Sequence, residues 1–96
     1  MSDKNPIPVF ARRLREAREV FDISQQNLGI KIGIDEFAAS PRINRYEMGV
    51  HQPALAIQQL LADALELPLA YFYAHDDELA QLIATFETSR KGRKKS

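Results

Sequence analysis

Residues that begin and end helices recur at short intervals along this chain, and they limit what it can fold into. Ser24 can cap the start of a helix with its hydroxyl, and Gly33 can end the same helix in the left-handed conformation that glycine adopts readily. Ser40 and Pro41 form a second start, a capping hydroxyl followed by proline at the first helical position, and Gly49 ends that segment. The alternation and hairpin turns that are typical of strands are nearly absent. The sequence therefore predicts an all-α fold of short helices.

Apolar residues at helical spacing predict further helices on both sides of this pair. The first helix has an apolar face at steps of four, three and four residues, formed by Phe10, Leu14, Ala17 and Phe21. Its opposite side, expected in solvent, carries Arg12, Arg13, Glu16 and Glu19. A fourth helix opens at Pro53, a short turn follows at 69–72, and a last helix covers 76–88. The basic residues 89–96 are expected to form a disordered tail.

Composition excludes several function classes. With 96 residues, of which 45% are hydrophobic, the chain is long enough for one domain and one core. It has no cysteine, and no apolar run approaches the ~20 residues of a membrane helix, so we expect a cytoplasmic protein without a membrane partner. Glycine-rich phosphate loops and metal-ligand clusters are absent too, so we expect neither an enzyme nor a cofactor. The net charge is zero, but residues 51–89 contain no lysine or arginine. All lysines and arginines therefore lie before residue 51 or after residue 89, and such clusters can bind an anionic partner despite the neutral total.

The two short helices in the middle have the layout of a helix-turn-helix, in which the second helix enters the major groove of DNA. In that second helix, expected at about 40–48, Ile43 and Tyr46 are three residues apart and must face the core. The residues that share the opposite face, with Arg42 at its edge, are Ser40, Pro41, Asn44 and Arg45. Arginine suits guanine and asparagine suits adenine, so this face is suited to reading bases.

The segment "LREAREVFDISQQNLGIKIG", followed by "INRYEMGVHQP", resembles the Cro/C1-type (XRE family) helix-turn-helix proteins. The resemblance covers residues 8–73 and implies a compact five-helix lambda-repressor-like domain, to which 76–88 adds a sixth helix. It implies that Gln25 touches a phosphate and braces the recognition helix, and that Ser40, Pro41, Asn44 and Arg45 face bases. It also implies an internal ion pair between Arg18 and Glu47.

Two positions depart from the family pattern. The interval from Gly33 to Ile43 is four residues longer than usual, so the family pattern fixes the start of the recognition helix only to within about a turn. Gly29 stands where the family prefers alanine. It weakens the helix by ~1 kcal/mol but permits a close contact with another helix.

Both histidines admit an ordinary explanation. His51 follows the recognition helix and is either a plain surface residue or a phosphate contact. His75 precedes Asp76, Asp77 and Glu78, but acids at a helix start are favoured by the helix dipole, so we expect no metal there. No small-molecule ligand is evident.

The last helix carries an apolar stripe that a five-helix domain does not need: Leu79, Leu82, Ile83 and Phe86. Either the helix folds back onto the domain or a second subunit covers the stripe. We expect a homodimer, because helix-turn-helix proteins bind paired half-sites.

The sequence thus predicts a sequence-specific DNA-binding transcriptional regulator, a repressor that binds an inverted-repeat operator as a dimer through the helix at about 40–48. The alternative is a helix-turn-helix-fold protein-interaction module, an antitoxin or regulatory partner without sequence-specific DNA binding. Such a module would more readily place apolar anchors where Arg42, Asn44 and Arg45 stand.

Overall fold

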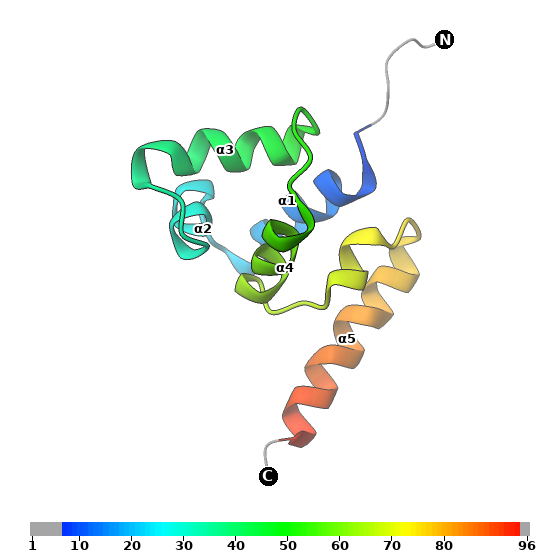
Figure 1. Cartoon of the computed structure of the whole chain (residues 1–96). Helices are drawn as coiled ribbons and strands as arrows, with labels where there is room; N and C mark the ends of the chain where they lie inside the picture. Colours follow the sequence, from blue (N-terminus) through cyan, green and yellow to red (C-terminus); the bar gives the residue numbers. More distant parts are fainter. Residues whose placement is uncertain (1–6, 95–96) are drawn as a thin grey trace, which may run out of the picture.

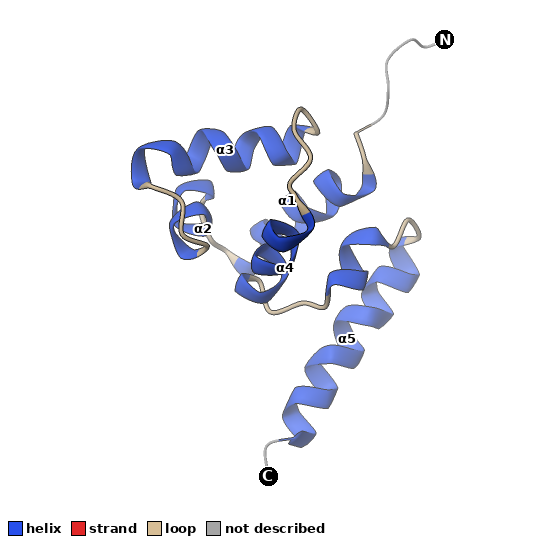
Figure 2. Cartoon of the chain, in the orientation of Figure 1, coloured by secondary structure: helices blue, strands red, loops and turns tan. Residues whose placement is uncertain are grey.

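The structure of the chain is a computed structural model that describes residues 7–94, with side chains as far as Phe86. In this part of the chain five α-helices and one 3₁₀ helix follow one another without a strand (Figure 1, Figure 2). In chain order they are α1 (Val9–Phe21), α2 (Gln25–Lys31), α3 (Glu36–Met48), α4 (Leu55–Ala64), η1 (Leu69–Tyr73) and α5 (Asp77–Lys94). None of the described helices is long and apolar enough to cross a membrane.

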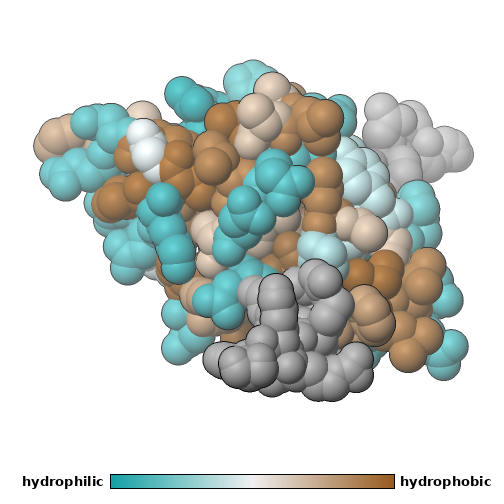
Figure 3. Space-filling model, turned by 60° about the horizontal axis from the view of Figure 1, so that its bottom comes forward, coloured by the Kyte–Doolittle hydropathy of each residue, from teal (hydrophilic) through white to brown (hydrophobic). Residues whose placement is uncertain are grey.

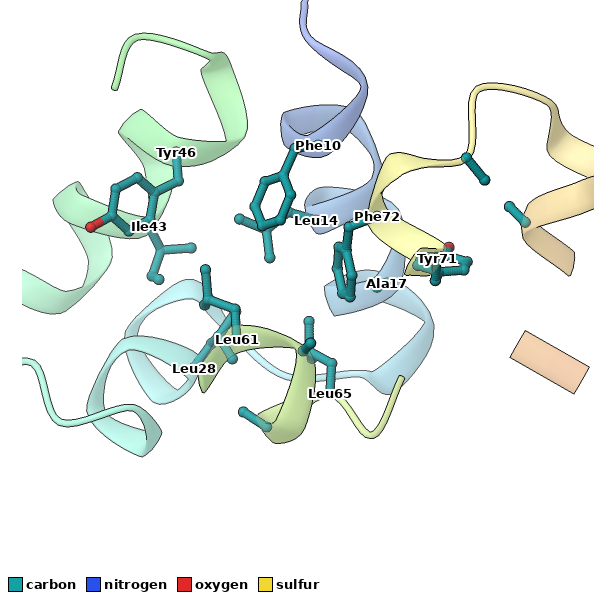
Figure 4. Close-up of a cluster of buried hydrophobic side chains, with 14 residues drawn as sticks. Phe10, Leu14, Ala17, Leu28, Ile43, Tyr46, Leu61, Leu65, Tyr71 and Phe72 are labelled. Carbon is teal, nitrogen blue, oxygen red and sulfur yellow. The ribbon is translucent and has the colours of Figure 1, made fainter. Parts of the chain in front are cut away.

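One fully buried side chain from each of the first five elements meets in the core (Figure 4). The five are Leu14 of α1, Leu28 of α2, Ile43 of α3, Leu61 of α4 and Phe72 of η1. The predicted apolar face of α1 is confirmed, because Phe10, Leu14 and Ala17 are buried and Phe21 packs against the cluster. A core built from five separate elements fixes their mutual positions, since interiors are close-packed.

Several predicted helix boundaries are confirmed. The hydroxyl of Ser24 accepts a hydrogen bond from the amide of Asn27 at 3.0 Å, so it caps α2. Gly33 has φ 98° just after α2, and Gly49 has φ 76° at the end of α3. Both values lie in the left-handed region that glycine adopts at little cost.

The predicted start of the third helix is wrong. The helix begins at Glu36, not near Ser40, because the carboxylate of Asp35 accepts from the amide of Phe37 at 3.0 Å and supplies the cap. Pro41 therefore lies inside α3, where it cannot donate a hydrogen bond to the carbonyl of Phe37. The four residues that lengthen the interval after Gly33 thus extend α3 by about one turn at its N-terminal end.

The C-terminal part also differs from the prediction. The short fifth helix is a 3₁₀ helix, η1, and the last helix is α5, which extends to Lys94 instead of ending at residue 88. The backbone of residues 89–94 is therefore helical, whereas residues 95–96 of the predicted tail lie outside the described residues. α5 packs mainly against η1 and then runs away from the bundle of α1 to α4 (Figure 1).

Candidate nucleic-acid interface

Helices α2 and α3 form the helix-turn-helix pair, and a glycine lets them approach closely. A Cβ added at Gly29 would lie 2.5 Å from the Cβ and 2.8 Å from the Cα of Ala39. Gly29 and Ala39 are both buried. The tight contact fixes α3 against α2 at the first turn of α3, the part that lies before the predicted start.

The outward face of α3 is polar and uncovered. Pro41, Arg42, Asn44 and Arg45 are exposed, whereas Ile43 and Tyr46 on the other side are buried. Ser40 is half-buried, and its hydroxyl donates to Oε1 of Gln25 at 3.3 Å, so it lies at the edge that faces α2. The two arginines and the asparagine therefore present their hydrogen-bonding groups to solvent.

Gln25, at the start of α2, holds α3 from the side. Its Nε2 donates to Oδ1 of Asn44 at 3.2 Å and to Oε1 of Glu47 at 3.1 Å. A carbonyl oxygen has two lone pairs, so Oδ1 of Asn44 keeps one acceptor site, and its amide nitrogen keeps its donors. Gln25 thus restricts the rotamer of Asn44, and Asn44 keeps the donors and the acceptor site that pairing with an adenine requires.

An ion pair behind α3 ties it to α1. Arg18 donates from Nε to Oε2 of Glu47 and from Nη2 to Oε1 of Glu47 at 3.2 Å, and from Nη1 to the carbonyl of Ile23 at 3.0 Å. Glu47 is buried, and this hydrogen-bonded pair raises the pKa of Arg18 against the opposing effect of burial. The guanidinium of Arg18 therefore serves the fold and is directed inward.

Arg13 was expected in solvent on the charged side of α1, and that prediction is wrong. Its side chain is 4% exposed. Nε donates to the carbonyl of Ala74 at 2.9 Å, and Nη2 donates to Oδ1 of Asp77 at 2.9 Å. Burial alone would lower the pKa of Arg13, but the hydrogen bonds that it donates to Asp77 and Glu16 outweigh this effect and raise that pKa. Arg13 thereby fixes the start of α5 against α1.

A sequence signal for this burial exists. Arg13 stands three residues after Phe10 and four before Ala17, so it flanks the apolar face of α1. Its partners Ala74 and Asp77, however, lie 61 and 64 residues further along the chain, and no local pattern connects them to Arg13.

Neither histidine belongs to α3. His51 is exposed in the loop after α3 and lines a hollow with Pro8, Tyr46 and Tyr73. His75 is exposed before α5, and the described residues contain no group of three or more side chains that could hold a metal ion.

The apolar stripe of α5 is only partly covered. Leu79, Leu82 and Phe86 are 49%, 67% and 62% exposed, whereas Ile83 packs against the core. In Figure 3 hydrophobic side chains gather at the lower right of the face in view. Three of the four residues predicted to form a dimer interface are therefore accessible in the single chain, and Ile83 contributes to the fold.

The chain matches no model of a known protein family and no curated protein. Among solved structures it is similar to the transcriptional regulator BswR, with 43% sequence identity and a TM-score of 0.77. The match covers 80% of this chain and 76% of that chain. It therefore includes most of both molecules and not only the helix-turn-helix pair.

Proposed function

The chain belongs to the family of the transcriptional regulator BswR, and we propose that it is a sequence-specific DNA-binding regulator of the Cro/C1 (XRE) type. The observation that carries the proposal is the outward face of α3. Arg42, Asn44 and Arg45 are exposed there on a helix that is held from the side by Gln25 and from behind by the Arg18–Glu47 pair. Rigid support of this kind lets a helix place its side chains in register with base edges.

In this proposal the side chains of α3 divide the work. Arg45 pairs with a guanine and Asn44 with an adenine in the major groove, each contact worth roughly 1–3 kcal/mol of discrimination. Ser40 and Pro41 line the same face, while Arg42 and His51 contact phosphates. Gln25 braces α3 instead of contacting a phosphate through its side chain, because both of its amide hydrogens are taken by Asn44 and Glu47. Phosphate contacts fix the register of a protein on the duplex, and base contacts supply the specificity.

We further propose that the chain acts as a homodimer and represses transcription at an inverted repeat. Leu79, Leu82 and Phe86 are uncovered, and a second copy of α5 would remove them from water. Arg13 fixes α5 to α1, so pairing through α5 would hold two recognition helices at a constant separation. A constant separation is what a pair of half-sites requires.

Selection of bound sites from a random duplex library tests the proposal. We expect enrichment of an inverted repeat, with affinity that falls steeply as salt rises. Arg45→Ala should leave one base position per half-site degenerate. The matched control is Arg15→Ala on α1, whose side chain is 61% exposed and pairs with Glu19; it should select the parent motif. Failure to retain any duplex at low salt would refute DNA binding and favour the protein-interaction alternative.

A further inference from the structure

An apolar side chain stands exposed at the start of the recognition helix. Phe37 lies in the first turn of α3 and is 85% exposed. Among the described large hydrophobic residues only Val20, on α1, is exposed to the same degree, at 86%. Single exposed apolar side chains are common on protein surfaces, so the place of Phe37 on α3, and not its exposure alone, carries the argument.

Phe37 belongs to the same face of α3 as the polar side chains. Pro41 follows it by four residues, Asn44 by seven and Arg45 by eight, which is the spacing of one side of a helix. Ala39 and Ile43, on the opposite side, are fully buried. The outward face of α3 is therefore apolar at its N-terminal end, with Phe37 and Pro41, and polar further on, with Asn44 and Arg45.

The position of this end favours base edges as the surface that it meets. In helix-turn-helix proteins the N-terminal residues of the recognition helix contact base edges. Figure 1 places the start of α3 at the edge of the molecule, away from α5. Asp35 and Glu36 are exposed beside Phe37, so this end of α3 offers no cation to a phosphate. Thymine presents an apolar methyl group in the major groove, which an exposed ring can contact.

We propose that Phe37 is a specificity-determining residue that contacts the C5-methyl group of a thymine in the major groove. This inference rests on the proposed function, namely that α3 reads DNA. Phe37 and Arg45 are eight residues apart, about 12 Å along a helix axis, and base pairs are spaced by about 3.4 Å. The thymine should therefore lie within about four base pairs of the position that Arg45 reads.

Replacing thymine by deoxyuridine removes only the methyl group, and this substitution tests the contact. The duplex enriched by the chain is prepared with thymine or with deoxyuridine at each thymine position in turn, and the affinity of each is measured. For one thymine per half-site we expect affinity to fall about fourfold, the factor that corresponds to one buried methyl group. Phe37→Ala should bind the two duplexes equally, whereas Val20→Ala, the control with equal exposure, should keep the difference.

Two outcomes would overturn the inference while DNA binding stands. Equal affinity of the parent chain for both duplexes at every thymine would show that no methyl group is read. A difference that persists in Phe37→Ala would assign the methyl contact to another residue, and the exposed ring would then fit a protein partner better. If the parent chain binds no duplex at all, the proposed function fails first and this inference falls with it.

Discussion

Gly29→Ala tests the closeness of α2 and α3, on which the position of α3, the proposed recognition helix, depends. The new Cβ would lie 2.5 Å from the Cβ of Ala39, 2.8 Å from its Cα and 3.1 Å from its carbonyl carbon. Two of these are backbone atoms, so no rotamer change relieves the clash and α3 must move. Overpacking of a core costs about 1–3 kcal/mol, and the close backbone contact favours the upper end. Alanine also improves helix propensity by ~1 kcal/mol, so the net destabilisation is about 2 kcal/mol.

Thermal and urea unfolding followed by circular dichroism measure this loss. For a domain of this size about 2 kcal/mol corresponds to a decrease in Tm of about 8–16 °C. In a double-mutant cycle, Ala39→Gly should offset part of the cost of Gly29→Ala, with a coupling energy of about 1 kcal/mol. Ala38→Gly is the control, because Ala38 is in α3 but is not among the atoms nearest the added Cβ. A Gly29→Ala variant as stable as the parent would refute the close contact.

Three further predictions concern the anchoring of α5, its exposed stripe and a buried tyrosine. Arg13→Met leaves the buried carbonyl of Ala74 without its donor and should destabilise the chain by about 2–4 kcal/mol in urea unfolding. Asp77→Ala changes a side chain that is 85% exposed and should cost at most about 1 kcal/mol. Equal losses of stability in the two variants would contradict the anchoring role of Arg13. Leu82→Glu should convert a dimer to monomers in analytical ultracentrifugation, whereas Leu55→Glu, at an equally exposed residue of α4, should not. If the Leu82→Glu variant remains a dimer, the apolar stripe of α5 is not the dimer interface. Burial raises the pKa of Tyr71 above its ordinary value of 10, so the folded chain keeps a proton that the unfolded chain releases. This contribution to the free energy of unfolding is complete below pH ~10 and is lost as the pH rises through the raised pKa. In Tyr71→Phe the free energy of unfolding should not show this decrease with pH.

The sequence identifies the elements whose signals are local. Ser24 and Gly49 act through contacts within their own turns, and Ile43 and Tyr46 follow from helical spacing, so all four can be predicted without a structure. The start of α3 is different, because Asp35 and Ser40 are both good capping residues. Starting at Asp35 brings Ala39 onto Gly29, and this tertiary contact is not visible in a window of ten residues.

Long-range partners explain a second difference between sequence and structure, the burial of Arg13. Arginine on the flank of an amphipathic helix usually extends into solvent. Arg13 is buried because the turn before α5 offers it the carbonyl of Ala74 and the carboxylate of Asp77. Residues of the outward face of α3, in contrast, make few contacts within the chain. Their capacity to bind DNA can therefore be inferred from the sequence as well as from the structure.

The central claim is that the outward face of α3 meets DNA, and nuclear magnetic resonance tests it most directly. A short duplex that contains the enriched half-site is titrated into the isotope-labelled chain, and the side-chain signals of Asn44 and Arg45 are followed together with the backbone amides. We expect the largest shifts at Asn44, Arg45 and the first turn of α3, with the amides of α4 unchanged. Shifts confined to α4 or α5, or no shifts at low salt, would contradict the assignment of α3 as the helix that reads DNA.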